Sequence, residues 1–481
     1  METSRRPPVP EDVRGPEPAP AIPAAVWRLA AVVVLGAFMS NLDTSVVNVG
    51  LDRIGASMHS TLGSAQWVAS GYLLALAAVM PVTGWLTRRL GAGWLWLGTL
   101  AAFTLTSAAC AAASSMGELI VLRVLQGLAG GMLIPAGQMM LARAAGPARM
   151  GRVMSTVGVA VVLAPVVGPV VGGLLISDSW RWLFLINVPI GAAGLIAGFF
   201  VIPRTAGRGE AGRLDVPGLV LAGAGLPLLT YGITVTSQRA SLASTGALVG
   251  LVGGAAALAA FAFWSMRSSR PLLNLRLWAN RAFSTALSVS FLGGGALFGG
   301  LVLVPLYFEV QRGQSTVDTG LLLIGQGVGA ALTMPLSGRL TDRVGGGVVS
   351  VAGLLITLAA TLPLVMLGAH PSFLLVEAIF TVRGLGTGLS IMPSVSAAYS
   401  AIEPAQILDA TPQLNAVQRV GGSIGTAVLV VLVDRSLAAG HTPVAAFHAA
   451  FWGLSAVTAL ALVPSVLLTL VLRRRPTGAG A

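Results

Sequence analysis

The chain has 481 residues, of which 55% are hydrophobic and only 10% are charged, whereas a soluble domain carries about 25% charged residues. This composition excludes an ordinary globular protein and predicts an all-α membrane protein with many spans. The formal charge of +12 comes entirely from arginine. The absence of lysine excludes a Walker A ATPase and a Schiff-base enzyme, and the scatter of arginines over short loops argues against nucleic-acid binding.

Residues 1–25 are rich in proline, carry mixed charge and lack the apolar core of a signal peptide, so we expect a disordered cytoplasmic tail. Fourteen apolar runs follow, each long enough to span a hydrocarbon core of about 30 Å. The single cysteine, Cys110, lies in the third run and is expected to be a packing residue. The runs cover residues 26–49, 66–86, 94–114, 117–142, 154–176, 182–203, 216–237, 243–266, 283–308, 319–338, 347–368, 371–397, 412–433 and 446–472.

The arginines divide unequally between the two sides of this predicted membrane. One set of tails and loops holds 21 of them and the alternate set holds five, while Arg123, Arg383 and Arg419 fall inside runs. Cytoplasmic loops carry the excess of positive charge. We therefore expect fourteen spans in the cell membrane, with both termini in the cytoplasm.

Two turns repeat one pattern. Gly84 to Gly91 follows the second run and Gly338 to Gly345 follows the tenth, and both read Gly-x-Leu-Thr-x-Arg-x-Gly. Internal repeats of this kind are typical of transporters that rock two similar halves against each other. We expect a six-span unit over 26–203, two extra spans with cytoplasmic linkers over 204–282, a second six-span unit over 283–472 and a cytoplasmic tail over 473–481.

Motifs in several spans resemble the major facilitator superfamily, and in particular its fourteen-helix drug:proton antiporter branch. The resemblance covers nearly the whole chain after the tail. The motifs are Leu42-Asp43-Thr44 with Asn48; Gln66-Trp67 with Tyr72; the turn at Gly84; Arg123-Val124-Leu125-Gln126-Gly127; Pro165 with Gly168-Pro169-Val170-Val171-Gly172-Gly173; Trp180-Arg181-Trp182 with Phe184, Asn187, Val188 and Pro189; and Pro305-Leu306-Tyr307.

The resemblance implies a major-facilitator-type fold and proton-coupled export of small amphipathic, often cationic, molecules by alternating access. It implies no enzyme activity and no cofactor beyond the proton as coupling ion; we expect a monomer in the lipid bilayer with a small-molecule substrate. Two alternatives stay open: an exporter or importer of a single metabolite, and a non-transporting membrane sensor or scaffold. The sequence departs from the pattern at Arg88, where aspartate is usual, and at Glu309, where an amide is more usual.

Asp43 is the first candidate for a proton site, because an aspartate at the centre of a span costs about 2.5–3.5 kcal/mol. At 1.5 Å per residue, Asp43 lies about 10 Å below the outer end of its run and Arg123 about 9 Å below the outer end of its own. The first and fourth spans are neighbours in the fold that the sequence resembles. We hypothesise that Arg123 lies near Asp43 and controls whether Asp43 holds a proton; a static salt bridge is the alternative.

Glu377, in the twelfth run, is a candidate second proton site. Arg383 follows six residues later, about 240° further around a helix axis, so we expect one of the two at the central cavity and the other at a helix interface. The histidines His370, His441 and His448 lack metal-ligand spacing, so no metal site is expected. The candidate residues of the substrate cavity are Asn48, Trp67, Tyr72, Gln126, Tyr307, Glu309 and Arg383.

The fifth run places small residues beside prolines, which lets helices approach closely and bends the span. Ordinary helix packing explains this as well as a functional hinge does; the resemblance implies the hinge in exporters. The residues concerned are Pro165, Gly168, Pro169, Gly172 and Gly173.

The repeated turns are candidates for a cytoplasmic gate. Gly91 and Gly345 would permit the tight turns, and we expect a latch between the second and eleventh spans. The alternative is that these arginines only set the topology. The gate candidates are Gly84, Arg88, Arg89, Gly91, Gly338, Asp342, Arg343 and Gly345.

Overall fold

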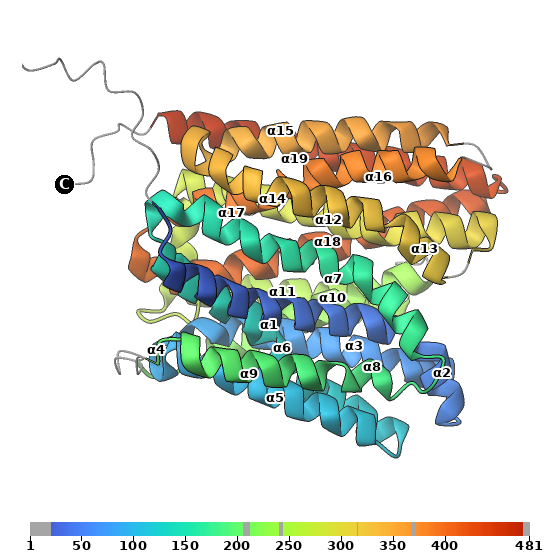
Figure 1. Ribbon diagram of the computed structural model, residues 1–481, viewed down its shortest axis with the longest axis horizontal. Helices are drawn as coiled ribbons and strands as arrows, with labels where there is room; N and C mark the ends of the chain where they lie inside the picture. Colours follow the sequence, from blue (N-terminus) through green and yellow to red (C-terminus); the bar gives the residue numbers. More distant parts are fainter. Residues whose placement is uncertain (1–20, 205–211, 240–243, 315, 368–371, 475–481) are drawn as a thin grey trace, which may run out of the picture.

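The computed structural model describes residues 21–204, 212–239, 244–314, 316–367 and 372–474. Within these ranges the protein is helical throughout and contains no β-strand (Figure 1). Fourteen stretches are long and apolar enough to cross a membrane, which confirms the number expected from the apolar runs. Most of the two expected tails, and His370, lie outside the described residues.

The helices follow one another in chain order as the fourteen spans. Spans 1 to 6 are α1 (Ala24–Val49), α3 (Leu62–Val79) with η2 (Met80–Val82) and α4 (Thr83–Leu90), α5 (Ala92–Ala112), α6 (Met116–Ala145), α7 (Met150–Leu175), and α8 (Trp182–Leu185) with α9 (Asn187–Val201). Spans 7 and 8 are α10 (Val216–Arg239) and α11 (Thr245–Arg267). Spans 9 to 14 are α12 (Arg281–Arg312), α13 (Thr316–Leu322) with α14 (Ile324–Val344), α15 (Gly346–Thr361) with η5 (Leu362–Met366), α16 (Phe373–Gly388) with α17 (Ile391–Ser400), η6 (Pro404–Gln406) with α18 (Ile407–Ala438), and α19 (Pro443–Arg473). The short helices α2 (Leu51–Ser57), η3 (Pro147–Arg149) and η4 (Leu275–Ala279) lie between spans.

Helix ends depend on backbone geometry more than on the limits of the apolar runs. The tenth run ends at residue 338, but α14 continues to Val344, because helical hydrogen bonding does not stop where polar side chains begin. Gly91 and Gly345 end α4 and α14 with φ of 88°, a conformation that favours glycine. At the other end of the chain, α1 begins at Ala24, inside the tail expected to reach residue 25.

The same helix pairs recur in spans 1–6 and in spans 9–14. The pairs α1–α7, α3–α6 and α5–α9 correspond to α12–α18, α14–α16 and α15–α19. In Figure 1, α5 and α9 lie at the bottom, α15 and α19 at the top, and α7 and α18 between them. This repetition fits two six-span units of similar architecture, here called the first and second units.

A central seam joins the two units. Along it, α7 packs against α13, α14 and α17, and α18 packs against η2, α4 and α6. The extra helix α10 contacts both α3 and α18, and α11 packs on α10. The two extra spans therefore lie beside the place where spans 2 and 13 meet. The arginine-rich loops, α4, α17 and the C-terminus are at the left of Figure 1, here called the arginine-rich side.

Candidate functional site

Asp43 lies at the centre of a buried polar cluster in the first unit. Its side chain has no exposed surface. Arg123 donates from Nη1 to Oδ2 of Asp43 at 2.6 Å, which forms a buried ion pair between α1 and α6. Gln126 and Asn187 donate their side-chain amides to Oδ1 at 3.2 and 2.8 Å. The proximity of Asp43 and Arg123 that their similar depths predicted is therefore present.

Further contacts fix the orientation of Arg123. Its Nε donates to the carbonyl oxygen of Val68 at 3.0 Å, and its Nη1 also donates to Oε1 of Gln126 at 2.7 Å. The guanidinium carbon lies 4.1 Å from the centre of the Tyr72 ring, a cation–π contact. A charge buried in a membrane protein is tolerated when such partners replace water, and here α1, α3 and α6 all supply them.

Arg383 occupies the corresponding place in the second unit, on span 12, but its partners are neutral. It is fully buried. Its nitrogens donate to Oε1 of Gln326 at 2.9 Å, to the Ala296 carbonyl at 3.0 Å and to Oγ1 of Thr361 at 3.3 Å. No carboxylate is among the hydrogen-bond partners that the structure gives it.

Glu377 is half-buried and faces the start of α14. A Cβ at Gly325 would lie 2.7 Å from Oε1 of Glu377, and Oε2 is buried without a hydrogen-bond partner among the described residues. Arg383 reaches Gln326, the next residue of α14. Both side chains therefore point to interfaces with α14, which corrects the expectation that one of them faces a central cavity. The 240° between them is reconciled by the length of the arginine side chain.

The residues expected to line one substrate cavity are dispersed. Tyr72 and Gln126 belong to the buried cluster around Asp43. Trp67 is half exposed and stacks on Tyr231 of α10, with ring centroids 6.2 Å apart. Tyr307 is buried among Phe308, Phe447 and Phe451. Asn48 is exposed and Glu309 is partly exposed near the outer ends of α1 and α12. A motif identifies the helix that carries a residue, but not the direction of its side chain.

The glycines of α7 contact α1 closely. A Cβ at Gly172 would lie 3.2 Å from the Val46 carbonyl oxygen, and a Cβ at Gly168 would collide with the side chain of Ser45. Ser45 donates to the carbonyl of Pro165 at 3.2 Å, on the turn that Pro169 leaves without an amide donor. Gly173 lies on the partly exposed face of the same helix.

The repeated turns form two ion pairs on the arginine-rich side. Arg88 pairs with Asp409 at the start of α18, at 3.1 Å. Asp342 pairs with Nε of Arg152 on α7 at 2.8 Å and also accepts a hydrogen bond from the backbone amide of Gly151. The pairs therefore join span 2 to span 13 and span 10 to span 5. This corrects the expected link between spans 2 and 11: the fifth helix of the opposite unit is the partner, and the two extra spans make that helix the thirteenth.

The glycines that open these turns mark the closest approaches of the two units. A Cβ at Gly84 would lie 2.5 Å from the Leu408 carbonyl oxygen, and one at Gly338 would lie 2.6 Å from Cα of Arg152. The other two arginines of the turns point elsewhere: Arg89 is exposed and lies over the ring of Trp85, and Arg343 is exposed.

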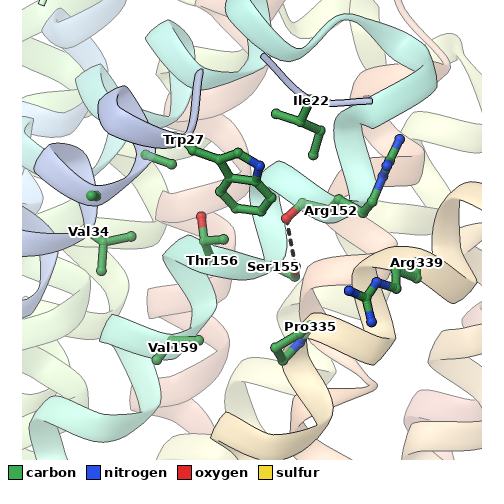
Figure 2. A pocket seen from close by; sticks show the side chains of 11 residues that line it. Ile22, Trp27, Val34, Arg152, Ser155, Thr156, Val159, Pro335 and Arg339 are labelled. Atoms are coloured by element: carbon green, nitrogen blue, oxygen red, sulfur yellow. Dashed lines mark hydrogen bonds between the residues drawn. The ribbon is translucent and has the colours of Figure 1, made fainter. Parts of the chain in front are cut away.

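A groove of about 490 Å³ opens beside the Asp342–Arg152 pair, between α1, α7 and α14 (Figure 2). Trp27 and Val34 of α1 form an apolar wall, Val159 of α7 and Pro335 of α14 face it, and Arg339 lies at its mouth. It is thus a mainly apolar opening along the seam, on the arginine-rich side.

Sequence reasoning missed Asn187, Gln326, Arg152 and Asp409 as site residues. Asn187 and Gln326 are amides within apolar runs, which is a signal that could have found them. Arg152 and Asp409 lie near the ends of apolar runs, where charge is common, so nothing in the sequence separated them from their neighbours. No group of three or more metal-binding side chains occurs among the described residues.

Comparisons with known proteins agree with this architecture. The family model for the Major Facilitator Superfamily matches residues 33–426. The chain is 38% identical over 412 residues to the multidrug resistance protein B homolog of Mycobacterium tuberculosis, covering 84% of this chain and 76% of that protein. It is 31% identical over 421 residues to the tetracenomycin C resistance and export protein of Streptomyces glaucescens, covering 86% and 77%. The fold resembles that of the human organic anion transporter MFSD10, with a TM-score of 0.63, 17% identity and coverage of 92% of this chain and 99% of that one.

Proposed function

The chain belongs to the major facilitator superfamily, in the fourteen-span branch related to multidrug-resistance and export proteins, and we propose that it exports small amphipathic molecules, often cationic, in exchange for protons. Its family consists of transporters, not enzymes. The resistance and export roles named for two relatives support export rather than uptake. We propose that it works as a monomer.

The buried Asp43–Arg123 pair carries this proposal. An ionisable residue inside a membrane span is by default a functional candidate, and Asp43 is the carboxylate with a charged partner at 2.6 Å and no exposed surface. A proton from outside reaches Asp43 only after the cluster around it opens. When Arg123 returns to 2.6 Å from Asp43, it displaces the proton, which then leaves towards the cytoplasm.

Substrate and proton compete for the same carboxylate in this scheme. A cationic substrate is attracted while Asp43 is charged and Arg123 is withdrawn, and it is released when Asp43 takes up a proton. Glu377 is the second proposed proton site, because one of its oxygens is buried without a hydrogen-bond partner among the described residues. The dispersed cavity candidates, including Asn48, Trp67 and Tyr307, would meet the substrate only in other conformations of the cycle.

The ion pairs Arg88–Asp409 and Asp342–Arg152 are the proposed cytoplasmic gate. Both join the two units on the arginine-rich side, which the positive-inside rule places in the cytoplasm together with both termini. The close contact of Gly168 and Gly172 with α1 is the proposed hinge, since glycine contacts allow two helices to slide without side chains interlocking.

Everted vesicles containing the protein test this proposal. With an acidified lumen, addition of a transported drug should release protons in the wild type. Asp43→Asn keeps the size and hydrogen-bonding capacity of the side chain but cannot titrate, so it should insert normally and lose proton-driven export. Glu377→Gln should reduce export less.

The matched control is Asp52→Asn, the same chemical change at an exposed position on α2, which should export normally. Full proton-driven export by a normally inserted Asp43→Asn variant would refute the mechanism. Proton-independent transport of one metabolite by the wild type would favour the single-metabolite carrier instead.

A further inference from the structure

A polar pocket of about 560 Å³ lies on the arginine-rich side, where the extra spans meet the rest of the protein. Four segments form its walls: the end of α4, the chain just before α10, the loop with η4 between α11 and α12, and the start of α18. Three of these segments meet only because the two extra spans are present. The transport cycle proposed above uses only the Arg88–Asp409 pair in one wall.

Asp215 holds two of the walls together. Its carboxylate accepts hydrogen bonds from the backbone amides of Gly218 and Leu272 at 3.0 and 2.9 Å, and from Nε1 of Trp264 at 2.8 Å. All three donors are neutral. The linker before α10 is thereby fastened to the loop after α11, while Asp215 makes no ion pair with an arginine of the described chain.

Four arginines and two aspartates line the pocket, so its walls carry a net charge of +2. Arg88 is paired with Asp409, and Arg276 donates to a backbone carbonyl at 3.3 Å. The side chains of Arg213 and Arg270 have no hydrogen-bond or ion-pair partner among the described residues. Two guanidinium groups facing this space are thus available to an anion.

The position of Arg270 is set by its neighbours. A Cβ at Gly212 would lie 3.0 Å from Nη1 of Arg270, so the guanidinium lies against the backbone of the opposite linker. That linker is tied to α4, because Nε1 of Trp85 donates to the carbonyl of Gly212 at 3.1 Å. Arg270 therefore faces the pocket from a fixed wall.

We propose that this pocket binds a phosphate-bearing anion, either a soluble phosphate compound of the cytoplasm or the phosphate of a lipid headgroup. Guanidinium groups match phosphate oxygens with paired hydrogen bonds. A phosphate monoester carries about −1.5 to −2 charges at neutral pH, which balances the net charge of the walls. The volume lies within the range of about 300–1,000 Å³ typical of small-molecule sites.

Binding there acts on the gate. Arg88 lines the same pocket as Arg213 and Arg270, so a bound phosphate competes with Asp409 for Arg88 and repels the carboxylate of Asp409. The anion therefore weakens the link between spans 2 and 13. The extra spans and their linkers thus form a regulatory site at the gate, and its binding property holds whether or not the protein exchanges drugs for protons.

The test uses the purified full-length protein in detergent, with pyrophosphate titrated at constant ionic strength and binding followed by the thermal unfolding midpoint. Saturable stabilisation is expected. Arg213→Gln and Arg270→Gln should each weaken apparent affinity about tenfold, as loss of a hydrogen bond to a charged group does. Asp409→Asn should tighten binding, because it removes a like charge from the wall. Arg267→Gln is the control: its guanidinium lies over Phe263 at 4.1 Å, outside the pocket.

The source of the phosphate is decided in phosphatidylcholine vesicles with and without phosphatidylglycerol. If a lipid headgroup is the ligand, phosphatidylglycerol stabilises the wild type, removes pyrophosphate binding and loses its effect in Arg270→Gln. If the ligand is soluble, pyrophosphate binding is the same in both vesicles. The proposal is overturned if neither pyrophosphate nor phosphatidylglycerol has an effect that depends on Arg213 and Arg270.

Discussion

Arg123 and Arg383 occupy corresponding places in the two units, and they are stabilised in different ways. Both side chains are almost completely buried. Arg123 forms an ion pair with Asp43 at 2.6 Å, whereas Arg383 is held by the amide of Gln326, the hydroxyl of Thr361 and a backbone carbonyl. One unit compensates its buried charge with a titratable group, and the other compensates it with neutral dipoles.

This difference separates a group that can switch from one that cannot. A proton can neutralise Asp43 and release Arg123, but no proton uptake changes the charge of the partners that hold Arg383. A guanidinium itself stays charged in proteins. We therefore assign proton exchange chiefly to the first unit, and regard Arg383 as a fixed brace between α12, α14, α15 and α16.

The largest effect expected from this comparison is on stability. Arg123→Gln leaves the carboxylate of Asp43 buried without its counter-charge, and breaking a buried pair in this way costs about 3–5 kcal/mol. Arg383→Gln leaves only neutral groups unpaired and should cost about 1–3 kcal/mol. Reversible unfolding of the purified variants in mixed micelles measures the difference.

The double variant Asp43→Asn with Arg123→Gln sharpens this result. It removes both charges, so it should recover much of the stability that Arg123→Gln alone loses. Equal losses for Arg123→Gln and Arg383→Gln, without recovery in the double variant, would show that the two arginines are stabilised alike.

The second prediction compares the α1–α7 and α12–α18 interfaces. A Cβ at Gly425 would lie 2.5 Å from Cα of Gly295, backbone against backbone, so Gly425→Ala should cost about 1–3 kcal/mol by overpacking. At Gly172 the nearest atoms, in Val46 and Val49, are 3.2 and 3.3 Å away, and Gly172→Ala should cost less than about 1 kcal/mol. Unfolding of the two alanine variants measures both values.

Gly172→Leu extends the comparison to function. The larger side chain cannot fit against α1, so this variant should reach the membrane but fail to export the drug, as measured by accumulation in cells that lack other pumps. A well-expressed Gly172→Leu variant with normal export would mean that close packing of α1 on α7 is not needed for the cycle.

Much of the fold was predictable from the sequence, because run lengths and arginine positions depend on the bilayer rather than on tertiary packing. Depth along a span also predicted that Asp43 and Arg123 meet. The partners Asn187, Gln326 and Asp409 were not predicted, since spans that are apolar all round carry no moment that shows which face is inside. Correct motifs at Trp67 and Tyr307 failed to predict a shared cavity for the same reason.

The third prediction concerns the two ion pairs of the proposed gate. The side chain of Asp342 is 4% exposed and that of Asp409 is 19% exposed. Asp342 also accepts a hydrogen bond from Gly151 at the start of α7. Asp342→Asn should therefore cost about 1–3 kcal/mol, and Asp409→Asn about 0.2–1 kcal/mol.

Salt separates the two pairs further. Added salt screens exposed charges more than buried ones, so the cost of Asp409→Asn should shrink between low and high salt while that of Asp342→Asn should hardly change. Unfolding of both variants at two salt concentrations measures this, with Arg343→Gln, an exposed charge of the same turn, as the control. The reverse order of costs would mean that burial does not set the strength of these pairs.

The smallest effect is expected at the N-terminus, which is attached to the first unit alone. Deletion of residues 1–20 should change stability by less than about 0.5 kcal/mol and leave export intact, as for a surface change. Deletion through Pro23 also removes Ile22, which packs against the core, and the Pro23 carbonyl, which accepts hydrogen bonds from the amides of Val26 and Trp27 at 2.9 and 3.3 Å. It should lower stability measurably and still permit export. Loss of export at normal abundance in the shorter deletion would attribute part of the difference between the two units to the tail rather than to Asp43.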